Sequence, residues 1–369
     1  MGGKALSCET TRLNKDRYLS LYEEITWKIC RELGYFQFEM SVIKSYKNKS
    51  DFGDLDILMT KKLTESQIIS ILDPVEIFTN GPVTSIGYKV IIDSEQIGIF
   101  QVDLIYCDPQ YYSFTNKLMS YDPIGNLLGM LFNALGFKLT NKGLFYKLKN
   151  PITNQLIDYV LVTLRFENAL TILDYSDIDY FIPDLYSKKD PMFCSLEDIY
   201  EFITQSKYFH PDIYLKTENL NSKSRTKFKK RHSVISFLDY IKDIRPPFDI
   251  AKLSIMSGEI VDSLSNSLEY LTIINEESFK DRCSKVLIEH QTKLEYRKRF
   301  NGKITSELTG LEGKELSFFM EQLINFYGGH HEFKNLILSL TEEGSKIAIK
   351  TFFVKYKETE KYELSSKNK

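Results

Sequence analysis

The chain contains few of the residues that build disulfide frames or structural metal sites. Its five cysteines are scattered without a C-x-x-C pair, and its five histidines show no ligand spacing. Scattered thiols are typical of a reducing compartment and argue against both a disulfide frame and a structural zinc site. We therefore expect a cytoplasmic protein with reduced thiols.

Long apolar runs are also missing. No run of 18 apolar residues occurs in the 369-residue chain, so we expect neither a membrane-spanning helix nor a membrane partner. The first residues, MGGKALSCETTRLNKDRY, lack the apolar core of a secretory signal. No excess charge of one sign is present, since 48 basic and 50 acidic side chains give a net charge of −2. A near-neutral total still allows a nucleic-acid partner where positive charge is clustered.

Apolar spacing in the first 150 residues predicts a mixture of helices and strands. Residues 13–34 and 64–72 have helical spacing, the second with Thr64 as its N-cap. Alternating runs predict strands at residues 36–46, 54–59, 76–80, 85–93 and 97–106. A helix over 123–136 and a hairpin over 137–148 are expected to follow.

From about residue 155 the pattern becomes mostly helical, with helices expected near 195–209, 234–244, 276–300 and 313–327. The expected fold class is therefore α+β, with a mixed-sheet domain over residues 1–150 and a helical C-terminal region. We divide that region into a basic middle part (151–250), a helical part (251–360) and a disordered polar tail (361–369).

Two aspartates, Asp54 and Asp56, interrupt the apolar run DLDILM. Alternate side chains of a strand share a face, which places these carboxylates about 6–7 Å apart. Asp103 occupies a similar apolar strand, FQVDLIY, and would join them if the two strands are neighbours. Clustered carboxylates repel unless a cation compensates them, and oxygen ligands favour Mg²⁺ or Mn²⁺. A turn aspartate beside a surface aspartate is the plainer interpretation of the pair alone.

The stretch SYKNKSDFGDLDILMT resembles the signature of the DNA polymerase β-type (family X) nucleotidyltransferases. Four more pieces resemble that family in the same order, over about residues 12–150: RLNKDRYLSLYEEITWKI, TNGPVTSIGYKVI, VDLIYCDPQYYSF and NALGFKLTNKGLF. The resemblance implies a polymerase β-like palm and two Mg²⁺ or Mn²⁺ ions. It also implies transfer of a nucleoside monophosphate from an NTP or dNTP to an acceptor hydroxyl, with release of pyrophosphate.

The same resemblance implies roles for individual residues. Asp54 and Asp56 would bind both ions, and Asp103 would bind the catalytic ion and help to activate the acceptor hydroxyl. Ser45 and Arg12 match triphosphate contacts of the family.

Further nucleotide contacts are implied around these residues. Asp122 and Asn126 match family contacts to base or sugar. The loop before the aspartates departs from the family because it lacks the signature arginine. Positive charge at the triphosphate is therefore expected from one or more of the loop lysines: Lys44, Lys47 or Lys49.

The acceptor is expected to be a nucleic-acid 3′ end, along a basic strip formed by Arg225, Lys227, Lys229, Lys230 and Arg231. A solvated helix face is the alternative interpretation of this strip. The tail sequence FNGKITSELTGLEGKELSFFM is loosely similar to the tail of tRNA CCA-adding enzymes, with glycine-led helix starts. Two other functions stay open: nucleotidylation of a protein or small molecule, and an inactive nucleic-acid-binding module.

Overall fold

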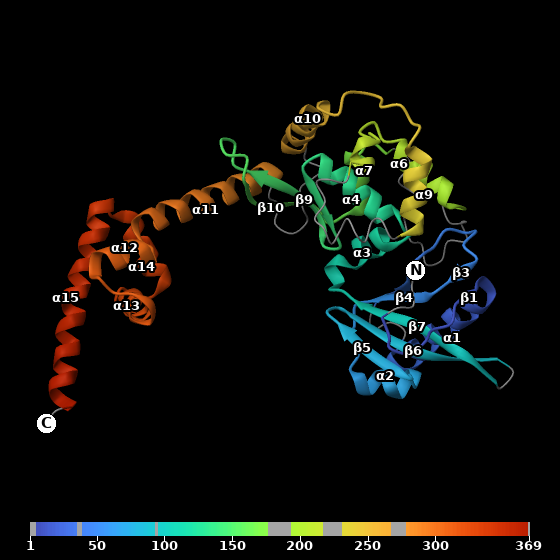
Figure 1. Cartoon of the computed structure of the whole chain (residues 1–369), viewed down its shortest axis with the longest axis horizontal. Helices are drawn as coiled ribbons and strands as arrows, with labels where there is room; N and C mark the ends of the chain where they lie inside the picture. The colour runs from blue at the N-terminus through green and yellow to red at the C-terminus, as the bar shows by residue number, and fades with distance from the viewer. Residues whose placement is uncertain are drawn as a thin grey trace. The chain divides into compact units, whose positions relative to one another are not determined.

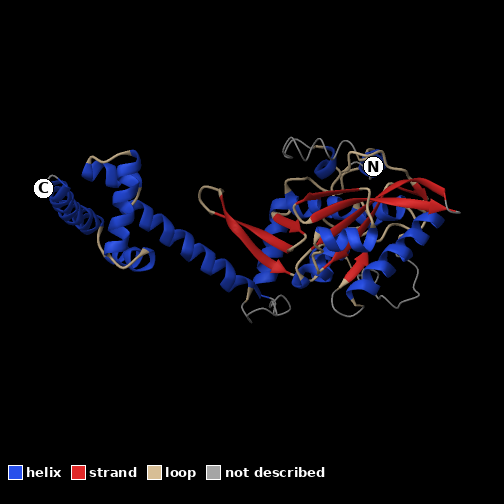
Figure 2. Cartoon of the chain, turned by 90° about the horizontal axis from the view of Figure 1, so that it is seen from below, coloured by secondary structure: helices blue, strands red, loops and turns tan. Residues whose placement is uncertain are grey.

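The structure is a computed structural model that describes residues 5–34, 39–92, 95–175, 193–216, 231–266 and 278–367 (Figure 1). The chain forms two compact units, Met1–Lys280 (unit 1) and Asp281–Lys369 (unit 2). In the described ranges all strands belong to unit 1, and unit 2 is helical (Figure 2). This confirms an α+β fold with a helical C-terminal region. The finer boundaries near residues 150 and 250 stay predictions.

A mixed five-stranded sheet carries the aspartates. Its strands, in spatial order, are β2 (Met40–Val42), β4 (Asp54–Met59), β7 (Glu95–Tyr106), β6 (Val83–Ile92) and β5 (Glu76–Asn80). β4 and β7 run parallel, and the other neighbours are antiparallel. The structure thus has a strand at each of the five predicted places. A separate two-stranded pair joins β1 (Leu13–Asn14) to β3 (Asp51–Phe52).

Two helices cover one face of the five-stranded sheet. They are α1 (Lys15–Leu33), which Asn14 caps, and α2 (Glu65–Leu72), whose capping box uses Thr64 as predicted. Their apolar stripes share a core with the alternate residues of β4 and β7 that face them. Because the period of a strand is two, the residues between these face the opposite side, and both β4 aspartates are among them.

A second, three-stranded sheet follows helix α4 (Ile124–Ala134). Its strands are β8 (Phe137–Thr140), β9 (Gly143–Lys149) and β10 (Leu156–Thr163), all antiparallel. The hairpin over 137–148 is confirmed, but β10 corrects the expectation of a mostly helical chain from residue 155. The run LIDYVLVT lacks the regular alternation of apolar and polar residues that predicts a strand, and it pairs along β9 with register shifts near both ends.

Helices complete unit 1: α3 (Tyr112–Met119), α5 (Phe166–Ile172), α6 (Leu196–Thr204), α7 (Asp212–Leu215), α9 (His232–Ile241) and α10 (Lys252–Asn266), with a 3₁₀ turn η1 (Pro109–Tyr111). The helices predicted near 195–209 and 234–244 are confirmed as α6 and α9. None of the helices in the described ranges combines the length and apolar character that a membrane span requires.

Unit 2 is built from α-helices around an aromatic core. They are α11 (Phe279–Arg299), whose first two residues lie in unit 1, α12 (Gly302–Thr309), α13 (Gly313–Phe326), α14 (His330–Ser339) and α15 (Glu342–Lys367). Gly302 and Gly313 each begin a helix, as expected from the tail sequence. The core includes Phe319 and Phe333, both fully buried. α15 continues to Lys367, into the tail that was expected to be disordered.

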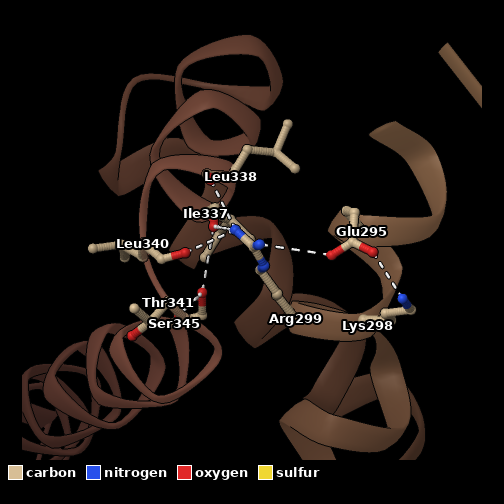
Figure 3. Close-up of polar contacts among 8 residues, drawn as sticks. All are labelled: Glu295, Lys298, Arg299, Ile337, Leu338, Leu340, Thr341 and Ser345. Atoms are coloured by element: carbon tan, nitrogen blue, oxygen red, sulfur yellow. Dashed lines mark hydrogen bonds and ion pairs between the residues drawn. The ribbon is translucent and has the colours of Figure 1, made fainter. Parts of the chain in front are cut away.

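Arg299, the last residue of α11, holds the end of α14 (Figure 3). Its Nη1 donates to the carbonyl oxygens of Ile337, Leu338 and Leu340 at 3.3, 2.8 and 2.7 Å. Its Nη2 lies 3.6 Å from a carboxylate oxygen of Glu295. One guanidinium therefore satisfies carbonyls that a helix C-terminus leaves without intrahelical partners.

Candidate metal centre

Three aspartates converge on the sheet face that α1 and α2 do not cover. Asp54 and Asp56 lie on β4, and Asp103 lies on β7 as the register partner of Asp56. One carboxylate oxygen from each aspartate lies within 4.8 Å of the others. The prediction that the strands are neighbours and that the three carboxylates meet is confirmed. We call these residues the aspartate triad.

The strand alternation that brings the triad together also separates it from the apolar core. Leu55 and Ile57 are fully buried in the core beneath the sheet, whereas the triad side chains are half-buried on the other face. A carboxylate removed from water without a compensating partner is costly. The fold therefore holds negative charge where it is poorly solvated.

The electrostatics of the triad favour a bound cation. Burial raises the pKa of Asp56 to about 7, and the charges of Asp54 and Asp103 act in the same direction. Burial also raises the pKa of Asp103, although hydrogen bonds with Ser85 and Gln101 oppose this. Both shifts mean that the ionised triad is unfavourable by itself. Three carboxylates with only oxygen donors suit Mg²⁺ or Mn²⁺, so the residues present fit such an ion.

Gln101 orients the Asp103 carboxylate. Its Nε2 donates to both Oδ1 and Oδ2 of Asp103, each at 3.0 Å, and the Gln101 residue is 3% exposed. Sequence reasoning missed this residue. The available signal was its position two residues before Asp103 on one strand, which places both side chains on the same face.

The loop before β3 brings two of the expected triphosphate contacts towards the triad. Lys49 Nζ lies 3.5 Å from Ser45 Oγ and 4.7 Å from the ring centroid of Phe52. The Lys49 charge also lowers the pKa of Asp56, against the larger effects that raise it. Lys49 therefore lies near enough to the triad to act on an anion bound there.

Backbone hydrogen bonds fix this loop to the helical part of unit 1. Lys47 N donates to Phe193 O at 2.9 Å, and Tyr121 N donates to Lys44 O at 2.7 Å. Lys15 Nζ donates to the carbonyl oxygen of Lys47 at 2.8 Å. The structure therefore positions the backbone of Lys44 and Lys47 next to the segments that precede α4 and α6.

Four other predicted site residues make protein contacts. Arg12 forms an ion pair with Asp51 at 2.7 Å, and Arg231 forms one with Asp122, also at 2.7 Å. Asn126 Nδ2 lies 3.4 Å from Asp122 Oδ1. Asp122 contributes to the raised pKa of Asp56, so it lies near the triad.

The basic strip can be judged at one position only. Arg231 donates to Asp122, so a nucleic-acid phosphate there would have to compete with a carboxylate. The other members of the strip fall outside the described residues: Arg225, Lys227, Lys229 and Lys230.

No family model matches the chain, and no curated protein matches it. Functional inference therefore depends on the triad, on the loop beside it and on the surfaces of unit 1.

Sequence reasoning also missed a basic face on the three-stranded sheet, which we call the lysine face: Lys138, Lys147, Lys149 and Tyr159. Lys147 is the register partner of Tyr159, and Lys138 Nζ lies 4.2 Å from the ring centroid of Tyr159. Burial lowers the pKa of Lys147, and the nearby charges of Lys149 and Lys138 lower it further. The signal in the sequence was the absence of acidic residues between Asp122 and Asp158.

Proposed function

We propose that the chain is a metal-dependent nucleotidyltransferase that transfers a nucleoside monophosphate from an NTP or dNTP to an acceptor hydroxyl. The observation that carries the proposal is the aspartate triad on adjacent parallel strands, with Lys49 beside it. Phosphoryl transfer depends mainly on alignment and charge neutralisation, and this arrangement offers both. The resemblance of residues 12–150 to family X enzymes, with a polymerase β-like palm, supports the same activity.

In this reaction the acceptor oxygen forms a bond to the α-phosphorus, and the bond from that phosphorus to the bridging oxygen breaks. Pyrophosphate leaves, and the acceptor hydroxyl loses its proton. Two Mg²⁺ or Mn²⁺ ions, when bound, supply Lewis-acid stabilisation of the attacking and leaving oxygens. Asp54, Asp56 and Asp103 would hold the ions, Lys49 and Ser45 would bind the triphosphate, and Asp103 would also take up the hydroxyl proton.

The lysine face supports a nucleic-acid acceptor. Closely spaced ammonium groups beside an exposed tyrosine ring form a surface that binds phosphates and stacks on bases. Lys147 has a lowered pKa partly because its neighbours are also cationic, and a polyanion relieves that repulsion. We propose a single-stranded 3′ end as the acceptor.

The test supplies Mg²⁺ or Mn²⁺, each labelled NTP and dNTP, and single-stranded, primer–template and tRNA-like acceptors. We expect extension of at least one acceptor and a loss of about a thousandfold in rate for Asp103→Ala. Asp108→Ala is the matched control, because Asp108 is exposed and makes no side-chain cap bond. Labelling without any nucleic acid would instead support nucleotidylation of a protein or small molecule. If no acceptor receives a nucleotide, the enzyme proposal fails, and the remaining hypothesis is an inactive nucleic-acid-binding module.

A further inference from the structure

Residues 5–11, which we call the strap, lie against the sheet, and residues 5–8 contact the face that carries the triad. Ser7 N and Cys8 N donate to the carboxylate of Glu76 on β5, at 2.8 and 2.9 Å. These bonds lower the pKa of Glu76 to about 2. Ala5 N donates to Gln101 Oε1 on β7 at 2.9 Å. The strap therefore binds two strands of the sheet through their side chains.

The anchors of the strap lie in the same row of the sheet as a triad aspartate. Glu76 pairs with Gly87, Gly87 pairs with Gln101, and Gln101 pairs with Asp54. Paired residues of neighbouring strands share a face and lie about 4.5–5.5 Å apart. The next row on this face contains Ser85, Asp103 and Asp56. The strap and the triad are therefore neighbours on one surface.

Two glycines of the sheet lie against the strap. On the triad face, a Cβ at Gly87 would lie 3.4 Å from Leu6 Cδ1 and 3.5 Å from Cys8 Sγ, which are ordinary contact distances, and 3.1 Å from Ile99 Cγ2 of the neighbouring strand. A Cβ at Gly98 would lie 2.1 Å from Thr11 Oγ1, which is a severe overlap. Thr11 N also donates to the carbonyl oxygen of Ile99 at 2.7 Å. Gly98 is in register with the core residue Val90, so this overlap lies on the opposite face, at the end of the strap that leads to β1. The strap therefore contacts Gly87 on the triad face and requires a residue without a Cβ at position 98.

Gln101 links the strap to the triad because both ends of its amide are used. Oε1 accepts from Ala5 N, and Nε2 donates to both oxygens of Asp103. The reversed amide would set its oxygen against a carboxylate and its NH₂ against a backbone N–H, so the network permits one orientation. The residue is buried, so losing either partner leaves a polar group unsatisfied.

We propose that Gln101 is a positioning residue for the metal centre and that strap docking and divalent-cation binding stabilise each other through it. The inference rests on the proposed function, in that Asp103 holds a metal. Outer partners of metal-binding carboxylates typically affect affinity by 10- to 100-fold. If docking of the strap raises the metal affinity by a given factor, thermodynamic linkage requires that bound metal raise the equilibrium constant for strap docking by the same factor.

The test measures Mn²⁺ binding to the full chain by calorimetry and hydrogen exchange of the strap amides with and without Mn²⁺. Gln101→Met keeps the bulk of the side chain but removes both hydrogen bonds, and we expect about tenfold weaker Mn²⁺ binding. Glu76→Ala releases the strap from β5 without touching the triad, and we expect about threefold weaker binding with faster exchange at Ser7 and Cys8. In the unmodified chain, Mn²⁺ should slow exchange at Ala5, Ser7 and Cys8.

Glu9→Gln is the control, because Glu9 is an exposed strap residue; it should bind Mn²⁺ as the unmodified chain does. Circular dichroism checks that each variant keeps the secondary structure of the unmodified chain. The inference is overturned if Gln101→Met and Glu76→Ala bind Mn²⁺ normally, or if Mn²⁺ leaves strap exchange unchanged. If the unmodified chain binds no Mn²⁺, the metal centre and the inference both fail. If binding and coupling are present but no nucleotide is transferred, only the proposed function fails.

Discussion

Replacing Asp56 with asparagine removes one of three clustered charges and keeps the size of the side chain. The pKa of Asp56 is about 7 in the folded chain against an ordinary 3.8. At 1.36 kcal/mol for each tenfold change in proton affinity, the ionised carboxylate destabilises the folded chain by about 4 kcal/mol. The buried amide must still find hydrogen-bond partners. We therefore expect metal-free Asp56→Asn to be more stable at pH 8 by about 2–4 kcal/mol.

The pH dependence has a definite sign. The folded-state pKa of Asp56 lies above that of the unfolded chain, so the folded state binds more protons between about pH 4 and pH 7. The stability of the metal-free chain should therefore fall as the pH rises through this window. Burial also raises the pKa of Asp103, which adds to the fall in the same direction. Asp56→Asn should show a smaller fall over the window.

The assay is urea unfolding in EDTA at pH 5 and pH 8, repeated with Mn²⁺. At 100 times its dissociation constant, Mn²⁺ should stabilise the unmodified chain by about 2.7 kcal/mol and the variant by less. Asp108→Asn, which removes an exposed charge, is the matched control. It should change neither the free energy of unfolding in EDTA nor the stabilisation by Mn²⁺. An Asp56→Asn variant that is no more stable than the unmodified chain at pH 8 in EDTA would refute the electrostatic reasoning.

Three further predictions test other contacts. Lys49→Met should raise the KM for the nucleoside triphosphate about tenfold, whereas Lys49→Arg, which keeps the charge, should have a KM close to that of the unmodified chain. Equal KM values for the two variants would contradict a role of the Lys49 charge in binding the triphosphate. Replacing the three lysines of the lysine face with glutamine should lower the salt dependence of single-strand binding by about 2 in log–log slope, and an unchanged slope would exclude that surface. Arg299→Met should lower the free energy of unfolding by about 2 kcal/mol; a loss no larger than that of Glu295→Gln, the control, would show that the three carbonyl bonds contribute little.

Sequence reasoning succeeded where a local period determines the structure. The alternation in DLDILM determines which side chains face away from the core. The triad could therefore be predicted by placing Asp103 on a neighbouring strand, as the structure has it. β10 was missed because apolar and polar residues do not alternate regularly in LIDYVLVT. Residue spacing alone therefore does not identify residues 156–163 as a strand.

Contacts between residues far apart in sequence were not accessible in this way. Gln101 receives its hydrogen bond from Ala5, 96 residues away, and Arg231 pairs with Asp122, 109 residues away. Both Arg231 and Asp122 were assigned to ligands because each was considered without the other. A sequence alone does not show which charged side chains form ion pairs within the protein and which can bind a ligand.

The parallel register of β4 and β7 makes the triad a reporter of correct strand pairing. A slip of β7 by one residue would turn Asp103 towards the core and bring Val102 to the surface, with little change in helix or strand content. Circular dichroism would not detect such an error in a refolded sample. Stoichiometric Mn²⁺ binding would, so the fraction of chains that bind the ion measures the fraction that folded in register.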